Sequence, residues 1–335
     1  MKLLEVKNLT VTFETDEGVF KAVDDVSFSV NKGEIVGVVG ESGCGKSVTA
    51  LSILRLLPSP PGNIENGEVL FNGSDLLRMD PKEMRRIRGK AISMIFQEPS
   101  AALSPLHRIG HQMIESIRLH EEIGWKEAWH IAEDWLKRVG ISDVEERMYS
   151  YPFQLSGGMQ QRIMIAMALM SAPALVIADE PTTALDVTIQ AQVFDLVRKM
   201  RDNYSSILLI THDMGVIWEM CDRVTVMYAS RIVEKGTRND IFASAAHPYT
   251  QGLLRSIPII SSEKGRLKAI PGQVPSPLKY PPGCYFNDRC PYAFERCKTE
   301  KPRLFRLGND HCAACFLVEE TVNCEETETK KSEKL

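Results

Sequence analysis

The residues best suited to chemistry lie in the stretch GESGCGKS, Gly40 to Ser47, between an apolar run and a helical one. It matches the pattern G-x-x-x-x-G-K-[ST], in which backbone N–H groups of a glycine-rich loop surround phosphate oxygens at a helix N-terminus. Lys46 is expected to reach the β and γ phosphates, and the Ser47 hydroxyl to bind the Mg2+ that bridges them. The predicted phosphate-binding residues are Gly40, Ser42, Gly43, Cys44, Gly45, Lys46, Ser47 and Val48. An ordinary glycine-rich turn is the alternative, and the strand and helix on either side argue against it.

Two more stretches place reactive groups at the ends of regular elements. LSGGMQQR, Leu155 to Arg162, is followed twelve residues later by ALVIADEPTTALD, an apolar run that leads into two carboxylates, Asp179 and Glu180. Because side chains alternate along a strand, these two carboxylates are expected to face different ways. Each feature has a simpler alternative. The glycine pair would be a helix start capped by Ser156, and the two acids would cap the next helix.

With these motifs in this order, from Met1 to about Phe242, the chain resembles the ATP-binding-cassette family. The family pattern LSGGQ stands here as LSGGM followed by Gln160, which keeps the phosphate-facing SGG. In that family the pattern covers the ATP held by the P-loop of a second ATPase subunit. The resemblance therefore implies a head-to-tail homodimer or heterodimer in which Ser156, Gly157 and Gly158 act in trans.

The resemblance also implies roles for residues near strand ends. Asp179 would bind Mg2+, and Glu180 would be the general base that polarises the attacking water. Gln97, in ISMIFQEP, resembles the glutamine that touches Mg2+ and this water. His212, in LLITHD, resembles the histidine that contacts the γ phosphate. The catalytic residues implied in this way are Glu180, His212 and Gln97.

Two further positions are assigned by the same resemblance. TTALD, Thr182 to Asp186, resembles the D-loop, so Asp186 is expected near the nucleotide. Phe13 fits the aromatic residue that stacks on adenine, and a place in the core of an amphipathic strand is its alternative.

The elements that must position these residues follow from the chain order. The runs EIVGVVG, ALVIADEP and SILLITHD read as strands, and helices are expected from Lys46 and Val187. Strands that alternate with helices predict a largely parallel sheet. LLEVKNLTVTF and AVDDVSFSV alternate apolar and polar residues around a DEG turn, which predicts an antiparallel sheet. Between Ile109 and Met170 the periodicity is helical, with a stripe from Trp125 to Val139 in WKEAWHIAEDWLKRVG.

The expected fold class is therefore α/β: a P-loop NTPase cassette with a mostly parallel core sheet, an N-terminal antiparallel β subdomain, a helical subdomain and a small cysteine-containing C-terminal extension. The expected domains are the nucleotide-binding domain at 1–243, its helical subdomain at about 98–170, the extension at 244–318 and a disordered tail at 319–335.

Composition limits the class of protein. The 335 residues, 44% of them apolar, suffice for a large core, and a net charge of -4 without a basic block argues against a nucleic-acid partner. The start MKLLEVKNLTVTF has no apolar stretch of signal-peptide length, and no later run approaches the roughly 18 apolar residues of a membrane span. A cytosolic protein is expected. The resemblance places it peripherally on the cytoplasmic face of the cell membrane, bound to two transmembrane permease subunits that receive solute from an extracellular binding protein.

The cargo is implied by segments outside the nucleotide motifs. EPSAALSPLHRIGHQM, HPYTQGLLRSIP and IPGQVPSPLKYPPGCYF resemble the ATP-binding subunits of oligopeptide and dipeptide importers. An ATPase that drives peptide import is therefore expected, with nickel or another small solute as the alternative cargo. A soluble cassette ATPase of DNA repair or translation is the rival class. Those proteins usually carry two cassettes or a long coiled-coil insert, and the sequence has neither pattern.

Four cysteines near the end of the chain could bind a metal. In a reducing compartment a cysteine cluster indicates a metal or catalytic site more often than disulfides. Zinc sites usually show two tight C-x(2-4)-C pairs, and only Cys312 and Cys315 are spaced in that way. The importer subfamily's C-terminal pattern matches a different set, which implies a [4Fe-4S] cluster, with zinc or unmetallated thiols as alternatives. The implied ligands are Cys284, Cys290, Cys297 and Cys315, with Cys312, three positions earlier, as the alternative fourth ligand. With Cys315 as the ligand, Cys44, Cys221, Cys312 and Cys324 remain free thiols.

Overall fold

The computed structural model describes residues 1–99, 102–182, 187–202, 205–257 and 269–319. Contacts within the chain divide it into two compact units. The first comprises residues 1–3, 30–35 and 72–210, and the second comprises residues 4–29, 36–71 and 211–335. The predicted domain boundaries at 243 and 318 do not coincide with this division and stay predictions.

Parallel strands form the centre of the first unit. β7 (Leu175–Asp179) pairs in parallel with β6 (Ile92–Ile95) on one side and with β8 (Ser206–Thr211) on the other. Every residue of β7 and β8 is buried, as expected for strands covered on both faces. Because the strands are parallel, their carboxyl ends lie at one edge, where ligands bind in sheets of this type.

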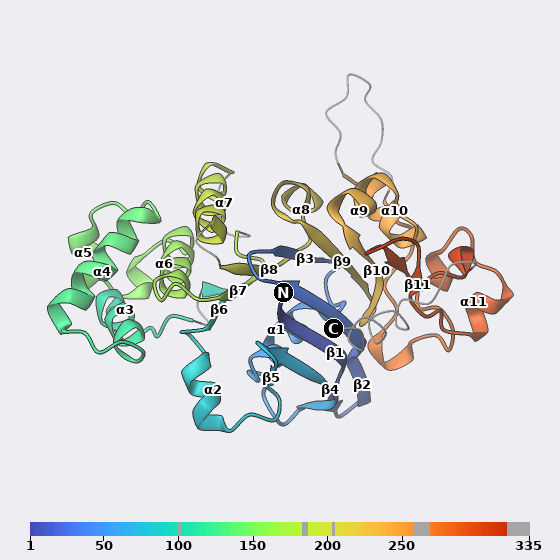
Figure 1. The fold of residues 1–335 in the computed structure, drawn as a ribbon, viewed down its shortest axis with the longest axis horizontal. Helices are drawn as coiled ribbons and strands as arrows, with labels where there is room; N and C mark the ends of the chain where they lie inside the picture. The colour runs from blue at the N-terminus through green and yellow to red at the C-terminus, as the bar shows by residue number, and fades with distance from the viewer. Residues whose placement is uncertain (100–101, 183–186, 203–204, 258–268, 320–335) are drawn as a thin grey trace, which may run out of the picture. The chain divides into compact units, whose positions relative to one another are not determined.

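Helices make up the rest of the first unit. A short strand, β5 (Ser74–Asp75), precedes them. The helices are α2 (Pro81–Ile87), α3 (Ile109–Arg118), α4 (Trp125–Arg138), α5 (Val144–Tyr149), the 3-10 turn η2 (Pro152–Gln154), α6 (Gly157–Leu169) and α7 (Val187–Asp202). Figure 1 shows α3, α4 and α5 grouped together, with α6 between them and the strands. The regular elements between Ile109 and Met170 are all helical, which confirms the predicted helical insert.

The predicted stripe on α4 is wrong at its start. Trp125 is 45% exposed, whereas the buried residues of α4 are Ala128, Ala132, Trp135 and Leu136. The buried face of α4 therefore does not include Trp125. It includes two small alanines, which let α4 pack closely against α3 and α6.

An antiparallel sheet begins the second unit. Its strands are β1 (Lys2–Thr15), β2 (Gly18–Asn31) and β4 (Gly62–Phe71), and β1 lies between the other two. β1 and β4 run antiparallel from Leu4, opposite Phe71, to Phe13, opposite Gly62. The alternating burial along β2 matches the alternation in its sequence. This confirms the predicted antiparallel sheet around the DEG turn.

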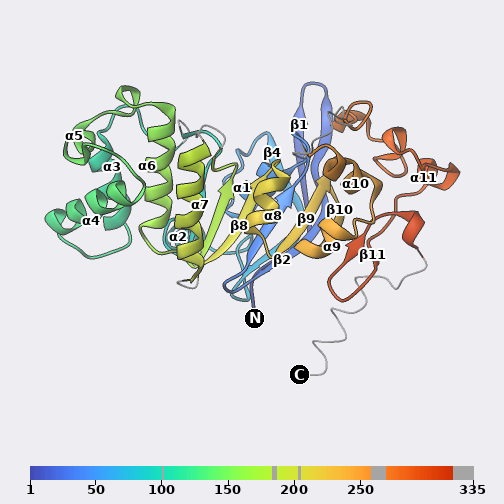
Figure 2. The same ribbon diagram turned by 90° about the horizontal axis from the view of Figure 1, so that it is seen from above.

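The second unit also contains the strand that leads into the P-loop. β3 (Ile35–Val39) is wholly buried and pairs in parallel with β9 (Arg223–Tyr228), which pairs antiparallel with β10 (Arg231–Thr237). The helices of this unit are α1 (Lys46–Ile53), α8 (Met214–Met220), α9 (Arg238–Ala243) and α10 (Pro248–Arg255). Figure 2 shows α8 and α9 over β9 and β10. The helix predicted to begin at Lys46 does so.

The C-terminal extension continues this sheet. Its elements are η3 (Pro277–Lys279), η4 (Asn287–Arg289), α11 (Glu295–Thr299), β11 (Phe305–Arg306), β12 (Cys312–Ala313) and η5 (Phe316–Val318). β12 pairs antiparallel with β10, where Glu234 lies opposite Ala313, and β11 pairs with β12. The extension is therefore joined to the cassette by backbone hydrogen bonds as well as by side chains.

Aromatic side chains fill the junction between the extension and the strands. The ring of Phe286 lies 5.2 Å from that of Tyr228 and 5.5 Å from that of Tyr249, centroid to centroid, and all three residues are buried. Rings at these separations and inclined angles pack favourably.

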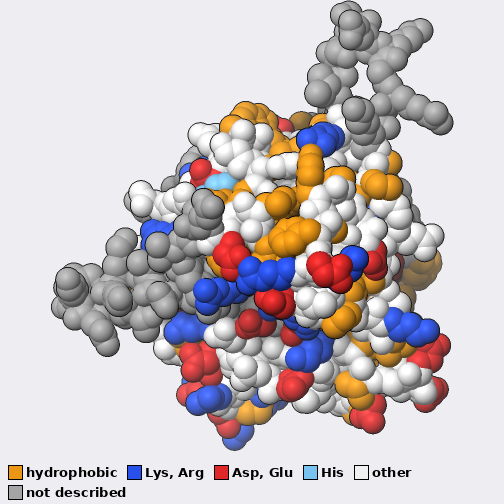
Figure 3. Space-filling view, turned by 90° about the vertical axis from the view of Figure 1, so that its right-hand side faces the viewer, with side chains coloured by type: hydrophobic (Ala, Val, Ile, Leu, Met, Phe, Trp, Pro, Cys, Tyr) orange, Lys and Arg blue, Asp and Glu red, His pale blue; other side chains and the backbone are white. Residues whose placement is uncertain are grey.

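On the face drawn in Figure 3, acidic and basic side chains are interspersed with hydrophobic ones. No helix among the described residues has both the length and the hydrophobicity to cross a bilayer.

Candidate nucleotide and metal sites

The P-loop connects the end of β3 to the start of α1. Gly45 caps α1 in a left-handed conformation, with φ of 101°, and a Cβ there would lie 2.3 Å from the carbonyl oxygen of Ala22. A Cβ at Gly40 would lie 2.1 Å from the carbonyl oxygen of Met227. Only glycine fits at these two places, because the loop passes directly against β2 and β9. The predicted phosphate loop therefore has the local geometry that its sequence requires.

Lys46 lies over this loop. Its Nζ donates to the carbonyl oxygens of Gly40, at 2.8 Å, and Glu41, at 3.1 Å, and the residue is 5% exposed. The ammonium group is thus held at the mouth of the loop by two carbonyl oxygens. Ser47 is half-buried at the first turn of α1. A hydroxyl at that position is an oxygen ligand of the kind that Mg2+ takes.

Cys44 is a structural residue of the loop. It is 1% exposed, and burial raises the pKa of its thiol, although the Lys46 ammonium acts in the opposite direction. A buried protonated thiol is a poor nucleophile, which agrees with the interpretation of Cys44 as a loop residue. Ser42 and Gly43, at the tip of the loop, are exposed, and Val48 is half-buried in α1.

Phe13, near the end of β1, is half-buried. Its ring stacks on that of Phe20 with centroids 5.8 Å apart and an interplanar angle of 15°. The chain turns closely past it at Gly62, where a Cβ would lie 3.2 Å from the ring. The predicted contact of Phe13 with adenine stays a prediction.

The first unit holds the two predicted carboxylates at the end of β7. Asp179 is the last residue of the strand and is 3% exposed. Glu180 follows with φ of 46°, and its N–H donates to the carbonyl oxygen of Ile210 at 2.8 Å. The left-handed conformation of Glu180 ends the strand directly after Asp179. Glu180 accepts a hydrogen bond from Nε2 of Gln97 at 3.3 Å. The structure thus brings two predicted catalytic residues together.

The remaining predicted residues lie in several places. Ser156 caps α6, and its Oγ accepts a hydrogen bond from the Met159 N–H at 3.3 Å, which confirms the capping role. Ser156 and Gly157 are exposed and Gly158 is half-buried, so this helix start is accessible to a partner. In the second unit, His212 is exposed one residue after β8. Asp186 lies outside the described residues.

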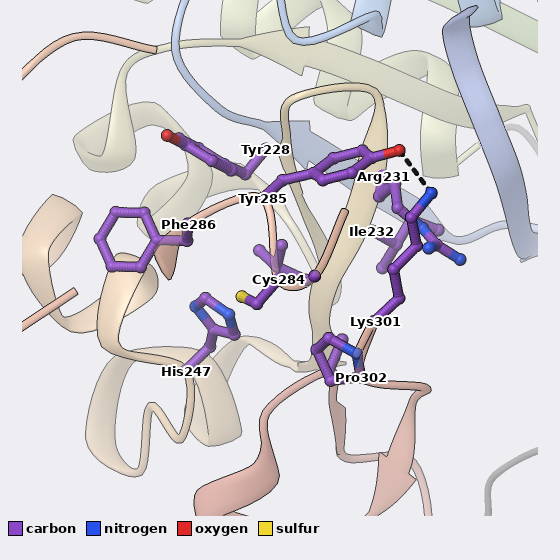
Figure 4. Close-up of a pocket in the computed structure, with 12 residues that line it drawn as sticks. Tyr228, Arg231, Ile232, His247, Cys284, Tyr285, Phe286, Lys301 and Pro302 are labelled. Carbon is purple, nitrogen blue, oxygen red and sulfur yellow. Dashed lines mark hydrogen bonds between the residues drawn. The ribbon is translucent and has the colours of Figure 1, made fainter. Parts of the chain in front are cut away.

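The four predicted cysteine ligands of the extension line one pocket. Cys284, Cys290, Cys297 and Cys315 surround it together with His247 and apolar residues, and the empty space amounts to about 320 Å³. A neighbouring pocket of about 330 Å³ shares Cys284 and His247. Figure 4 shows the Cys284 sulfur turned toward the His247 ring, and Lys301 beside Tyr285. Nζ of Lys301 donates to the Tyr285 hydroxyl at 2.8 Å.

The thiols of this pocket affect one another. The pKa of Cys284 is raised to about 11, mainly by burial and to a smaller extent by Cys297, Cys315 and Cys290. Burial likewise raises the pKa of Cys315 to about 11. Backbone N–H groups act in the opposite direction on three thiols, from Phe286 to Cys284, Tyr292 to Cys290 and Leu317 to Cys315. N–H groups aimed at sulfur favour the thiolate, the form that binds a metal.

Two findings qualify the predicted cluster. Among the described residues, no group of three or more His, Cys, Asp or Glu side chains is arranged as a metal site. Cys312 is disulfide-bonded, so the prediction that it is a free thiol is wrong. Cys312 is buried in β12 beside β10 and is not among the residues that line the pocket. Cys324 lies outside the described residues, and Cys221 is a buried free thiol.

Known proteins match the chain along most of its length. Residues 23–183 match the ABC transporter family, and residues 233–297 match the C-terminal region of oligopeptide/dipeptide transporters. The oligopeptide transport ATP-binding protein AppD of Bacillus subtilis is 49% identical over 95% of this chain and 97% of its own. The dipeptide transport ATP-binding protein DppD of Escherichia coli is 45% identical over 94% of this chain and 96% of its own. This chain belongs to the ABC transporter ATP-binding proteins.

Solved structures agree with this membership. The ATP-binding cassette MJ0796, described as a dimer in a post-hydrolysis state with ADP and phosphate, has a TM-score of 0.64 and 26% identity. The alignment covers 70% of this chain and 98% of that one. The predicted fold class is confirmed. As an ABC transporter ATP-binding protein the chain is an ATPase.

Sequence reasoning missed one residue of this ABC ATPase site. Glu41, at a variable position of the P-loop pattern, binds Tyr249 through its N–H and Arg289 through its carboxylate. No local signal indicated it, because Tyr249 is 208 residues away and Arg289 is 248.

Proposed function

We propose that this chain is the ATP-hydrolysing subunit of an importer for di- and oligopeptides, bound to two transmembrane permease subunits at the cytoplasmic face of the membrane. The observation that carries the proposal is the likeness to peptide-transport ATP-binding proteins over the whole length, C-terminal region included. A cassette alone does not specify cargo, so the extension and not the ATPase core supports the peptide assignment. An extracellular solute-binding protein delivers the peptide to the permeases.

In this proposal the two parts of the nucleotide site have separate roles. The P-loop binds the phosphates through its backbone N–H groups and Lys46, whose ammonium exchanges its two carbonyl partners for phosphate oxygens. Ser47 and Asp179 supply oxygen ligands for Mg2+, which offsets the negative charge of the phosphates. Phe13 stacks on adenine, and His212 contacts the γ phosphate.

Glu180 is the general base of the proposed reaction. Its carboxylate takes a proton from the water that attacks the γ phosphate, and Gln97 holds that carboxylate or the water in place. The left-handed φ of Glu180 supports this role, because strain of this kind is retained where it positions a functional group.

The proposed enzyme is a head-to-tail dimer with a second ATPase subunit. Ser156, Gly157 and Gly158 at the exposed start of α6 would contact the nucleotide on the P-loop of that subunit. A helix N-terminus suits phosphate oxygens. MJ0796, the solved cassette with the same fold, is described as dimeric, which supports this arrangement.

We also propose that Cys284, Cys290, Cys297 and Cys315 bind one [4Fe-4S] cluster. Four cysteines around one pocket and backbone N–H groups that act on three of the sulfurs fit this donor set. The cluster would be structural, because its metal–sulfur bonds would join four segments of an extension that is rich in loops.

The nucleotide-binding domain is assigned to residues 1–243 and the extension to 244–318.

Peptide uptake tests the proposed function. Cells that lack this chain are complemented with the wild type or with Glu180→Gln, and uptake of a radiolabelled dipeptide, a radiolabelled pentapeptide and nickel ions is measured. Peptide uptake restored by the wild type alone supports the proposal. Restored nickel uptake without peptide uptake assigns a different cargo, and equal uptake with both chains rejects the ATPase role of Glu180.

A further inference from the structure

Glu41, in the P-loop, is hydrogen-bonded to two residues of the C-terminal part of the chain, Tyr249 and Arg289. Its N–H donates to the Tyr249 hydroxyl of α10 at 2.9 Å. Its carboxylate accepts two hydrogen bonds from Arg289, at 2.7 and 3.1 Å, in the parallel two-bond arrangement that arginine makes with carboxylates. All of these residues belong to the second unit. We call Tyr249 and Arg289 the Glu41 clamp.

The Arg289 side chain of the clamp is held in place by contacts other than the one with Glu41. The Arg289 side chain is 4% exposed, and its Nε donates to the carbonyl oxygen of Pro271 at 2.9 Å. The guanidinium carbon lies 5.7 Å from the centre of the Tyr228 ring and 5.9 Å from that of Phe286. An arginine held by packing and by a second acceptor loses little further freedom when it binds Glu41, so it can impose a position on the loop.

A second contact joins the same two parts of the chain. The Ser230 N–H donates to the carbonyl oxygen of Cys44 at 3.1 Å, and the Ser230 hydroxyl lies 2.8 Å from that of Tyr280 in the extension. The P-loop is thus held near both ends from the C-terminal side, at Glu41 and at Cys44. Neither contact uses the tip of the loop, at Ser42 and Gly43, which stays exposed.

The clamp matters most when nucleotide binds. Lys46 now holds the carbonyl oxygens of Gly40 and Glu41, and those bonds are lost when its ammonium turns to phosphate. The clamp uses the N–H and the carboxylate of Glu41 instead, so it does not compete with that exchange. A loop that is already held in shape loses less conformational entropy on binding, which increases affinity.

We propose that Arg289 and Tyr249 are positioning residues for the P-loop, through which the C-terminal extension sets the affinity of the site for Mg-nucleotide. The inference rests on the proposed ATP site at Lys46. It assigns to the extension a role in nucleotide binding by the ATPase, in addition to any contact that the extension makes with a partner protein. Neither residue touches the nucleotide in this proposal, and both act through Glu41.

Calorimetric binding of Mg-ADP to the purified full-length chain, together with steady-state ATPase kinetics, tests the proposal. Arg289→Ala and Glu41→Ala should each raise the Kd and the KM by about tenfold, within the usual range of coupling between sites. The kcat of Arg289→Ala at saturating ATP should stay within about twofold, because Arg289 touches neither the nucleotide nor the reacting groups. The double variant should be no weaker than either single variant, whereas independent effects would multiply.

Conservative variants separate positioning from general loss of structure. Arg289→Lys should recover only part of the affinity, because lysine cannot donate two parallel hydrogen bonds to Glu41. Tyr249→Phe removes only the hydroxyl and should raise the Kd about fivefold, equivalent to one neutral hydrogen bond. If Arg289→Ala does not fold, as judged by its thermal unfolding, Tyr249→Phe and Glu41→Gln decide the question.

Arg296→Ala is the matched control. Arg296 precedes Cys297 as Arg289 precedes Cys290, and it pairs with Glu300 and Glu319 instead of a P-loop residue. Its substitution should leave the Kd unchanged. An unchanged Kd in folded Arg289→Ala and Tyr249→Phe, or an equal rise in Arg296→Ala, overturns the inference. A wild type that does not bind Mg-ADP, or a Lys46→Ala variant that binds it equally well, would instead reject the proposed ATP site.

Discussion

Gln97 and Glu180 are 83 residues apart in the chain, and their side chains meet at 3.3 Å beyond the ends of the neighbouring parallel strands β6 and β7. The Gln97 amide donates this hydrogen bond to one oxygen of the Glu180 carboxylate. A movement of the segment that carries Gln97 would therefore shift the carboxylate that we assign as the general base.

Glu180→Gln should lower the ATPase kcat by about 10²- to 10⁴-fold, the usual contribution of a general base. Dimerisation in the presence of ATP should persist, because the amide keeps the size of the side chain. Malachite-green phosphate release and size-exclusion chromatography measure the two effects. Glu127→Gln, at an exposed position of α4, is the control and should behave as the wild type. Turnover near the wild-type rate in Glu180→Gln would show that another residue is the base.

Gly45→Ala should destabilise the chain more than Gly43→Ala. Both glycines have positive φ, so both substitutions introduce about 1 kcal/mol of backbone strain. Only at Gly45 would the new Cβ meet backbone, 2.3 Å from the Ala22 oxygen, and overpacking of this kind typically adds about 1–3 kcal/mol. Urea unfolding without nucleotide measures the difference. Equal stabilities for the two variants would contradict the close packing of the P-loop on β2.

His247 should make stability fall as the pH decreases. Burial lowers its pKa from 6.5 to about 4, although Glu234 acts in the opposite direction. The unfolded chain therefore binds a proton that the folded chain excludes. The contribution of neutral His247 is complete above pH 6.5 and decreases as the pH falls toward 4, with a loss of about 2 kcal/mol between pH 7 and pH 5.

His247→Asn isolates that contribution. Asparagine does not titrate in this range, and its side-chain oxygen can replace Nδ1 of His247 as the acceptor for the Tyr249 N–H. Urea unfolding at pH 7 and pH 5 should show a smaller decrease in the variant than in the wild type. Groups that lie far from His247 contribute equally to both proteins and cancel in the difference. Parallel decreases would place the titration elsewhere.

The proposed [4Fe-4S] cluster predicts that the purified protein is coloured and contains iron. Protein purified without oxygen should be brown and hold about four irons per chain, as expected for one [4Fe-4S] cluster. Cys315→Ser should remove the iron because Cys315 lines the pocket, whereas Cys312→Ser should retain it because Cys312 is disulfide-bonded in β12. Elemental analysis and visible absorption measure both. The reverse pattern would reassign the fourth ligand, and one zinc without iron would reject the cluster.

Much of the fold follows from local sequence. IVGVV and LVIAD are short runs of apolar residues, and each forms a wholly buried strand because only a sheet covered on both faces hides such a run. The P-loop pattern likewise defines its own conformation, because Gly40 and Gly45 are the residues that close backbone approach permits. The face of α4 was predicted less well. Periodicity correctly placed Ala132 and Leu136 on the buried face, but it included the exposed Trp125 and missed Ala128, whose burial depends on neighbouring helices.

The sequence by itself determined the nucleotide chemistry, because the phosphate loop, the helix starts and the strand-end carboxylates are local patterns whose geometry is set within a few residues. Only the tertiary structure decided which distant residues meet: Gln97 with Glu180, four cysteines around one pocket, and Arg289 with Glu41. The physical reason is that a contact across 83 or 248 residues depends on how strands pair and pack, and neither residue carries a local mark of its partner.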